Sequence, residues 1–245
     1  MTMRPTPIAI AALSFGCAVL VAAENGAKSG EIRVLCSNGM RAVVEEVRPQ
    51  MERAIGHPLA IEFSSTASFK EKIDAGATFD VAILTSEAID SLTKQGKIAP
   101  GTRADVARTG VGVGVRAGAP KADISTPDKL KQALLQAKSI TYTRNGASEV
   151  FVTRMIDRLG IASELKPKLI AETRAGRVSQ SVAEGQAGMV LTLISEILPV
   201  HGVQFLGPLP QELQGYVVLT AGVGAQSKNA EAAKAVEASM RKGEF

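Results

Sequence analysis

Hydrophobic and polar positions along the chain follow two alternating patterns. Short apolar runs bounded by small polar residues favour β-strands, and segments with apolar positions three or four residues apart favour amphipathic helices. The predicted strands are Ile32–Leu35, Leu59–Phe63, Val81–Leu84, Gly110–Val115, Ser139–Thr143, Gly188–Leu193, Val203–Leu206 and Tyr216–Ala221. The predicted helices are Met40–Ile55, Thr66–Ala75, Glu87–Gln95, Asp128–Gln136, Glu149–Leu159, a short one within Ile161–Leu169, Arg177–Glu184, Ser195–Leu198 and a last one from Asn229 or Ala230 to Arg241. This alternation is typical of a mostly parallel sheet covered by helices.

The chain divides into two such α/β units. Gly110–Val115 alternates glycine with valine, which indicates close packing by other backbone. We expect this strand to carry the chain into the second unit and Tyr216–Ala221 to bring it back, so that two crossing strands form a hinge. The predicted boundaries are 24–108 plus 222–245 for domain 1 and 109–221 for domain 2. The fold class is α/β, with two domains that close like a clam.

The N-terminal segment predicts export. Arg4 is followed by an uncharged apolar run from Ile8 to Ala23, and small residues precede Glu24. This is the pattern of a signal peptide over residues 1–23, so we expect a periplasmic protein. A membrane anchor is the alternative, but the run is about 16 residues long, short of the ~20 that span a bilayer. A lipid anchor at Cys17 is less favoured, because the residues before it make a poor lipobox.

Charge and cysteine content limit the kinds of ligand and of covalent cross-link that we expect. The formal net charge is +4, and Lys and Arg are scattered rather than gathered in a stripe with aromatic residues. The composition therefore favours a mild attraction for anions over nucleic-acid binding. After cleavage only Cys36 remains, so no intrachain disulfide forms, and its place after an apolar run predicts a buried thiol. His57 and His201 have no metal-ligand spacing, so we expect no metal site. We also expect no cofactor and a monomeric chain.

The residues that could bind a ligand follow the ends of the predicted strands. In open α/β sheets, ligands bind beyond the carboxyl ends of strands, near helix N-termini. A single polar turn is more simply explained as a helix cap. Its recurrence after successive strands favours an anion site made of backbone N–H groups and hydroxyls. The turns are Cys36-Ser37-Asn38-Gly39, Ser64-Ser65-Thr66-Ala67-Ser68, Thr85-Ser86 and Arg144-Asn145-Gly146-Ala147-Ser148.

Charged residues near these turns leave two interpretations open. Arg144, Arg174 and Arg177 are either exposed loop charges or a bidentate clamp for a carboxylate. Glu149 and Asp80 are the carboxylates nearest the expected cleft, although Glu149 also suits a helix N-terminus and Asp80 a turn. The sequence has no Walker-type phosphate loop and no G-x-S-x-G elbow, and neither histidine follows a strand.

The order of these motifs resembles the periplasmic molybdate-binding protein family, which consists of type II (Venus-flytrap) solute-binding proteins of ABC transporters. The resemblance extends from Glu31 to about Lys234. It implies a fold of two α/β lobes, a small anionic ligand and a membrane permease as partner. The residues that carry it are the strand-end turns, Asp74-Ala75-Gly76-Ala77, Phe79-Asp80-Val81-Ala82-Ile83-Leu84, Lys94-Gln95-Gly96-Lys97, Arg116-Ala117-Gly118-Ala119-Pro120 and Ile194-Ser195-Glu196-Ile197-Leu198-Pro199.

The resemblance also assigns roles within the site. It implies that Ser37 and either Ser64 or Ser65 bind the anion, and that backbone N–H groups of Ser148 and of the Arg174–Arg177 stretch complete the site. Molybdate binders of the family carry a ligand tyrosine near the end of the strand Gly188–Leu193, whereas this chain reads Leu191-Thr192-Leu193 there. That departure and the arginines favour a larger anion with carboxylate groups. The expected ligand-binding residues are Ser37, Asn38, Gly39, Ser64, Ser65, Thr66, Arg144, Ser148, Arg177 and Thr192.

The same broad family includes aconitate isomerase, so two functions follow from the resemblance. The first is a solute-binding protein that captures an oxyanion or carboxylate for an ABC importer. The alternative is a periplasmic isomerase of a tricarboxylate, for which Glu149 or Asp80 is the candidate proton-transfer group. Family members continue past a helix like Glu231–Arg241 with a further helix, whereas this sequence stops at Phe245. We therefore expect either a truncated chain or a less completely covered domain 1.

Overall fold

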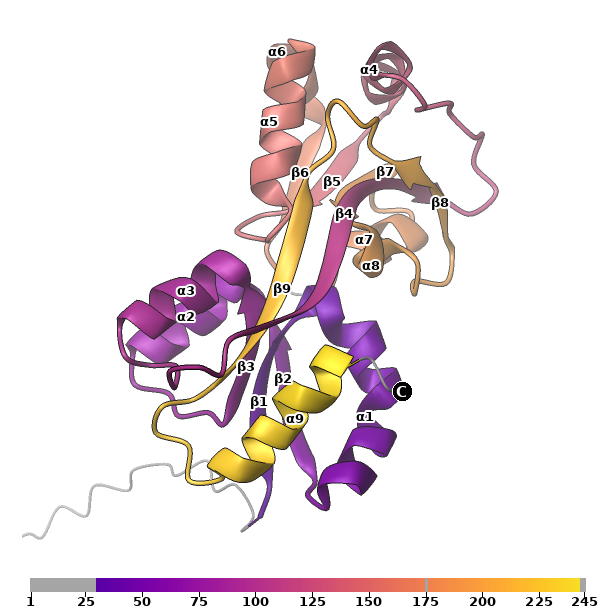
Figure 1. Cartoon of the computed structure of the whole chain (residues 1–245). Coiled ribbons are helices and arrows are strands. Elements are labelled where there is room, and N and C mark those ends of the chain that lie inside the picture. The colour runs from indigo at the N-terminus through magenta and orange to yellow at the C-terminus, as the bar shows by residue number, and fades with distance from the viewer. Residues whose placement is uncertain (1–29, 175, 243–245) are drawn as a thin grey trace, which may run out of the picture.

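Two α/β lobes stand one above the other and are joined by two long strands (Figure 1). The protein is described by a computed structural model that covers residues 30–174 and 176–242, so the predicted signal peptide lies outside the described residues. The shared strands are β4 (Ala104–Arg116) and β9 (Tyr216–Val223).

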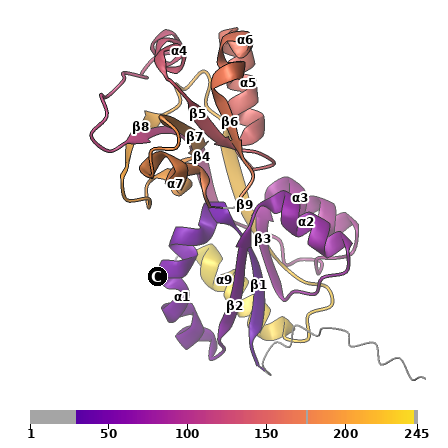
Figure 2. The same cartoon turned by 180° about the vertical axis from the view of Figure 1, so that it is seen from behind.

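The first lobe contains the N-terminal elements and the C-terminal helix. Helices α2 and α3 cover one face of its sheet, and α1 and α9 cover the other (Figures 1 and 2). Its elements are β1 (Ile32–Ser37), the 3-10 helix η1 (Asn38–Met40), α1 (Arg41–Ile55), β2 (Leu59–Ser64), α2 (Thr66–Asp74), β3 (Val81–Thr85), α3 (Ser86–Lys94) and α9 (Ala230–Lys242).

The second lobe contains the middle of the chain. Its strands β5 and β7 are parallel and sit between helices, and β8 runs along the outer part of β4. Its elements are α4 (Pro127–Gln136), β5 (Ile140–Thr143), α5 (Glu149–Leu159), α6 (Ala162–Leu165), the 3-10 helix η2 (Lys166–Lys168), β6 (Leu169–Glu172), α7 (Val178–Ala183), β7 (Met189–Leu193), α8 (Ile194–Ile197) and β8 (Val203–Pro208).

One continuous sheet runs through both lobes in the order β2-β1-β3-β9-β4-β7-β5-β6. Strands β1, β2 and β3 are parallel, as are β5, β6 and β7, whereas β9 and β4 are antiparallel to their neighbours. Strand β4 pairs with β9 as far as Gly110 and with β7 from Val111 onward. The two lobes therefore meet where β4 changes partner.

Each lobe has its own apolar core. Residues of β1, α1 and α9 fill the first, and residues of β4, α4, α5 and β7 fill the second. Val217, Leu219 and Ala221 of β9 are buried in the first core. The boundary expected at 221 falls within β9, which pairs with β3 on one side and with β4 on the other. Phe151 of α5 packs against both cores.

The helix and strand order expected from the sequence matches the structure except at two strands. Strand β6 was missed because Ile170 and Ala171 are exposed and carry no buried apolar run. Strand β4 begins at Ala104 rather than near Gly110, since its first half is half-exposed and polar. The glycines of β4 are packed mainly by side chains rather than by backbone: a Cβ at Gly112 would lie 2.7 Å from Phe205 Cε2 and 2.9 Å from Ile194 Cγ1.

Candidate functional site

A small cavity lies between the lobes, lined by the turns that follow β1, β2 and β5 and by the start of α8. It measures about 20 Å³, close to the space of one water molecule. The side chains and backbone that line it are Ser37, Asn38, Gly39, Ser65, Thr66, Thr143, Arg144, Gly146, Ala147, Thr173, Leu193 and Glu196. The strand-end turns of both lobes are thus brought to one place.

The first lobe contributes two of these turns. Ser37 is buried at the end of β1, where the apolar run stops and η1 begins. Ser65 is the N-cap of α2, and its Oγ accepts a hydrogen bond of 3.1 Å from the N–H of Ser68. Ser64 is the last residue of β2, pairs with Ser37 and does not line the cavity. Of the two serines left open by the sequence, Ser65 is the one at the cavity.

The second lobe contributes the turn before α5. Asn145 has a φ of 57°, which turns the backbone sharply after Arg144. The N–H of Asn145 donates to Glu149 Oε2 at 2.7 Å, and Arg144 Nε lies 3.7 Å from Glu149 Oε1. Glu149 therefore holds the turn and complements the N-terminus of α5, which leaves the half-exposed Arg144 beside the cavity.

A row of hydroxyl groups leads from this turn into the second lobe. Ser148 Oγ and Thr143 Oγ1 lie 3.5 and 3.4 Å from Thr192 Oγ1. The Thr192 hydroxyl donates to Glu196 Oε2 at 2.5 Å. Ser148 and Thr192 are buried and do not line the cavity. The hydroxyl of Thr192 contacts Thr143 and Glu196, which do line it.

Glu196 is the charged residue among the cavity-lining residues that the sequence patterns missed as binding residues; the others are Thr143, Gly146, Ala147, Thr173 and Leu193. It lies on α8, directly after β7, and it lines the cavity together with Ser37 and Ser65. Burial raises the pKa of its carboxyl above the ordinary glutamate value, and the hydrogen bond from Thr192 partly opposes this rise. The signal was available: the turn after β7 is one more strand end, and the same rule that found Ser37 and Ser65 applies to it.

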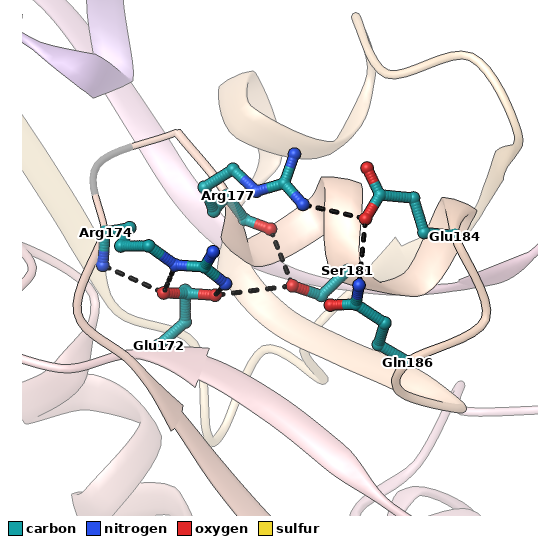
Figure 3. Close-up of polar contacts among 6 residues, drawn as sticks. All are labelled: Glu172, Arg174, Arg177, Ser181, Glu184 and Gln186. Carbon is teal, nitrogen blue, oxygen red and sulfur yellow. Dashed lines mark hydrogen bonds and ion pairs between the residues drawn. The ribbon is translucent and has the colours of Figure 1, made fainter.

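The predicted arginine clamp is not assembled at the cavity. Figure 3 shows Arg174 against Glu172 and Arg177 against Glu184, all within the second lobe. The Nη2 atoms of both arginines lie 2.7 Å from their carboxylate partners. The bond from Arg174 lowers the pKa of Glu172 to about 2, and that from Arg177 lowers the pKa of Glu184. Both arginines are therefore committed to their own lobe.

Asp80 lies at the other edge of the sheet. It precedes β3, so it sits at the amino end of a parallel strand and away from the strand-end turns. Its Oδ2 accepts from the N–H of Arg33 at 2.8 Å, and its Oδ1 accepts from Ser227 Oγ at 2.5 Å. Asp80 thus joins β1, β3 and the segment before α9, and it is not brought to the cavity.

Two larger cavities flank the central one. A cavity of about 310 Å³ shares Thr66 and Ala147 with it and opens toward Lys70 and Tyr216. Another, of about 220 Å³, shares Asn38 and Glu196 and opens toward Arg41. The space between the lobes therefore extends to both sides of the turns.

Two further properties concern the described ranges, 30–174 and 176–242. No helix in them is long and apolar enough to cross a membrane. They also bring together no group of three or more His, Cys, Asp or Glu residues that could hold a metal ion. Cys36 is buried in the first core, and burial raises the pKa of its thiol.

Residues 32–241 match the model of a protein family described as bacterial extracellular solute-binding proteins. The chain belongs to this family. It is 29% identical over 244 residues to the aconitate isomerase of a Pseudomonas species, which covers 96% of this chain and 90% of that protein. It is 24% identical over 173 residues to the molybdate-binding protein ModA of Azotobacter vinelandii, covering 70% of this chain and 68% of that one.

Solved structures of the family share the fold. The periplasmic molybdate-binding protein of Azotobacter vinelandii superposes with a TM-score of 0.73, covering 85% of this chain and 92% of that one at 17% identity. The resemblance seen in the sequence is thereby confirmed, and so is the type II binding-protein fold. This is a solute-binding protein whose cleft contains the cavity described above.

Proposed function

We propose that this protein captures a small anion bearing carboxylate groups in the periplasm and delivers it to the permease of an ABC importer. The observation that carries this proposal is the meeting of three polar strand-end turns at one cavity between the lobes. Two of these turns begin α2 and α5, whose first N–H groups and dipoles favour negative charge. The hydroxyls of Ser37 and Ser65 add hydrogen-bond donors.

The proposed ligand-binding residues follow from this placement. Ser37, Asn38, Gly39, Ser65 and Thr66 would bind from the first lobe. Arg144 and the backbone of the turn after it would bind from the second, with Thr192 and Ser148 as the buried hydroxyls behind them. Contacts from both lobes would favour the closed form, which a permease distinguishes from the open one.

The size of the cleft supports a ligand larger than a tetrahedral oxyanion. The flanking cavities of about 310 and 220 Å³ leave room for additional carboxylate arms. Arg144 provides a cation beside the central cavity. The end of β7 reads Leu191-Thr192-Leu193, without the tyrosine that the resemblance to molybdate binders implies near the end of this strand. Each flanking cavity is lined by one cation and by at least one carboxyl group, Lys70 with Glu87 in the larger and Arg41 with Glu45 and Glu196 in the smaller.

Calorimetric titration tests the ligand class. The protein would be titrated with molybdate, tungstate, sulfate, citrate, cis-aconitate and trans-aconitate under one set of conditions. We expect the carboxylates to bind more tightly than the tetrahedral oxyanions. Tight binding of molybdate and tungstate alone would contradict the carboxylate assignment.

The isomerase remains a second candidate because the aconitate isomerase relative covers 96% of this chain. Catalysis would require a proton-transfer group at the cleft. Asp80 lies too far from the cavity for this role, and Glu149 is engaged by the Asn145 turn. NMR of cis-aconitate with catalytic amounts of protein decides the matter. Turnover to the trans isomer, lost in a folded Glu149→Gln or Glu196→Gln variant, would overturn the pure binding function.

A further inference from the structure

We propose that Glu196 contacts the bound anion as a neutral carboxyl group that donates a hydrogen bond to it. This inference rests on the proposed function, because it concerns the same cleft and the same class of ligand. It adds a specificity-determining residue that hydroxyl-rich turns alone do not supply.

The position of Glu196 is the first part of the argument. Its side chain lines the central cavity beside Ser37, Ser65 and Arg144, and it also lines the flanking cavity of about 220 Å³. It therefore stands where the ligand space continues from one cavity into the next. A ligand that bridges the two cavities must pass this carboxyl.

The surroundings of Glu196 are the second part. Glu196 is part-buried, and within 30–174 and 176–242 it makes no ion pair. Its carboxyl accepts hydrogen bonds from the hydroxyl of Thr192 and from the backbone N–H of Leu193. Three of the elements packed on α8, namely β7, β8 and η1, carry no charged side chain. The fourth is β4, whose uncharged Gly112 and Gly114 lie against Ile194 and Ile197 of α8. A carboxylate that is buried without a cation is destabilised relative to the neutral acid.

Charged groups across the cavities do not neutralise Glu196. Arg41 and Glu45 face it across the flanking cavity and pair with each other at 3.2 Å. Arg144 faces it across the central cavity and lies 3.7 Å from Glu149. Arg41 thus has a carboxylate neighbour on its own helix, and Arg144 has one at the start of α5. Burial raises the pKa of Glu196, in agreement with these surroundings.

A neutral carboxyl group can donate a hydrogen bond to an anion, whereas an ionised carboxylate repels it. The protonated group offers one O–H donor, while the ionised group offers acceptors only and would place like charges side by side. In the protonated state Glu196 takes the place of the neutral donor that a tyrosine hydroxyl would provide. Binding would then require the proton on Glu196, and affinity would fall as that proton is lost.

The test compares the wild type with Glu196→Gln, whose amide stays neutral and keeps an N–H donor at every pH. The probes are cis-aconitate, citrate and molybdate, titrated between pH 5 and 9. Protonation of the ligand itself cancels in the ratio of the two dissociation constants, so this ratio is the readout. Glu46→Gln is the matched control, because Glu46 is exposed on α1 and the charge change is the same.

We expect the ratio of wild-type to Glu196→Gln dissociation constants to be near one at low pH. Above the pKa of Glu196 it should rise by about tenfold per pH unit, because one proton is then taken up on binding. Glu196→Leu, which has no donor, should bind at least about tenfold more weakly than Glu196→Gln throughout. The control should follow the wild type.

Two failures are distinguishable. A ratio that does not change with pH, in variants whose circular dichroism shows them folded, overturns the role of Glu196 and leaves the proposed function intact. Absence of binding of every probe to the wild type at every pH overturns the proposed function, and this inference with it.

Discussion

The side-chain amide of Gln214 hydrogen-bonds both backbone groups of Val111. Its Oε1 accepts from the N–H at 2.9 Å, and its Nε2 donates to the carbonyl at 3.0 Å. Val111 is the residue at which β4 leaves β9 and joins β7. The side-chain amide therefore makes the pair of hydrogen bonds that a neighbouring strand would make, at the residue where β4 changes its partner strand.

Gln214→Ala should destabilise the protein at this crossing. Val111 keeps backbone bonds to Gly215 and Leu209, so the loss should be about 1 kcal/mol in the free energy of unfolding rather than more. Urea unfolding measures it. Gln211→Ala, at an exposed position nearby, is the control and should change little. Equal stabilities of the two variants would show that the Gln214 amide does not support the crossing.

Gly112→Ala should be destabilising through steric contact. The new Cβ would lie 2.7 Å from Phe205 Cε2 and 2.9 Å from Ile194 Cγ1, so β4, β8 or α8 must shift. Overpacking of this kind costs about 1–3 kcal/mol. Thermal unfolding should show partial rescue in the double variant with Phe205→Leu, because the smaller side chain makes room. If the loss of stability in the double variant equals the sum of the losses in the two single variants, the contact between the new Cβ at position 112 and Phe205 is contradicted.

Alanine substitutions at Ser37 and Ser65 should affect ligand affinity and stability to different extents. Ser65→Ala removes the cap of α2 and should cost about 1 kcal/mol of stability in addition to ligand affinity. Ser37→Ala removes no cap hydrogen bond and should weaken ligand binding by about fivefold to tenfold with a smaller change in stability. Thr126→Ala removes the cap of α4, far from the cleft, and should lower stability alone.

Arg144→Ala should weaken the binding of carboxylates more than that of molybdate. Its guanidinium lies beside the cavity, and its ion pair with Glu149, at 3.7 Å, is longer than the 2.7 Å pair of Arg174 with Glu172. We expect a loss of about tenfold or more for cis-aconitate in calorimetric titration. Arg174→Ala is the control, because Arg174 is bound to Glu172 in the second lobe. Unchanged affinity in Arg144→Ala would make this arginine a surface charge.

Glu172 should contribute to stability at neutral pH but not in strong acid. The hydrogen bond from Arg174 lowers the pKa of Glu172 to about 2, below the ~4.3 of an unfolded chain. Its contribution is therefore fully present above about pH 4.3 and is lost as the pH falls toward 2. We expect about 1–2 kcal/mol, because Arg174 is largely exposed and solvent screens the pair.

Glu172→Gln tests this in unfolding experiments from pH 7 to pH 2. The variant should be less stable than the wild type at pH 7, and the two should converge at low pH. Glu164→Gln, at an exposed position of α6, should remain close to the wild type throughout. A constant difference between the Glu172 variant and the wild type across the pH range would contradict the ion pair.

Local patterns in the sequence determined the order of elements and the turns at the cleft. Apolar periodicity depends on neighbouring residues, so it predicted α1, α2 and α5 and most of the strands. Because parallel strands end at one edge, placing Ser37, Ser65 and Arg144 after strands was enough to expect them together. Where exposure removed the apolar pattern, as in β6, the prediction failed.

Tertiary structure decided which partners these residues have. The burial of β9 in the first core and the bonds of Asp80 to Arg33 and Ser227 depend on contacts between residues far apart in the chain. Glu196 is the clearest case. Its sequence neighbours are those of any short helix, and the packing of α8 against β7 and η1 places its part-buried carboxyl in the same cavity as Ser37.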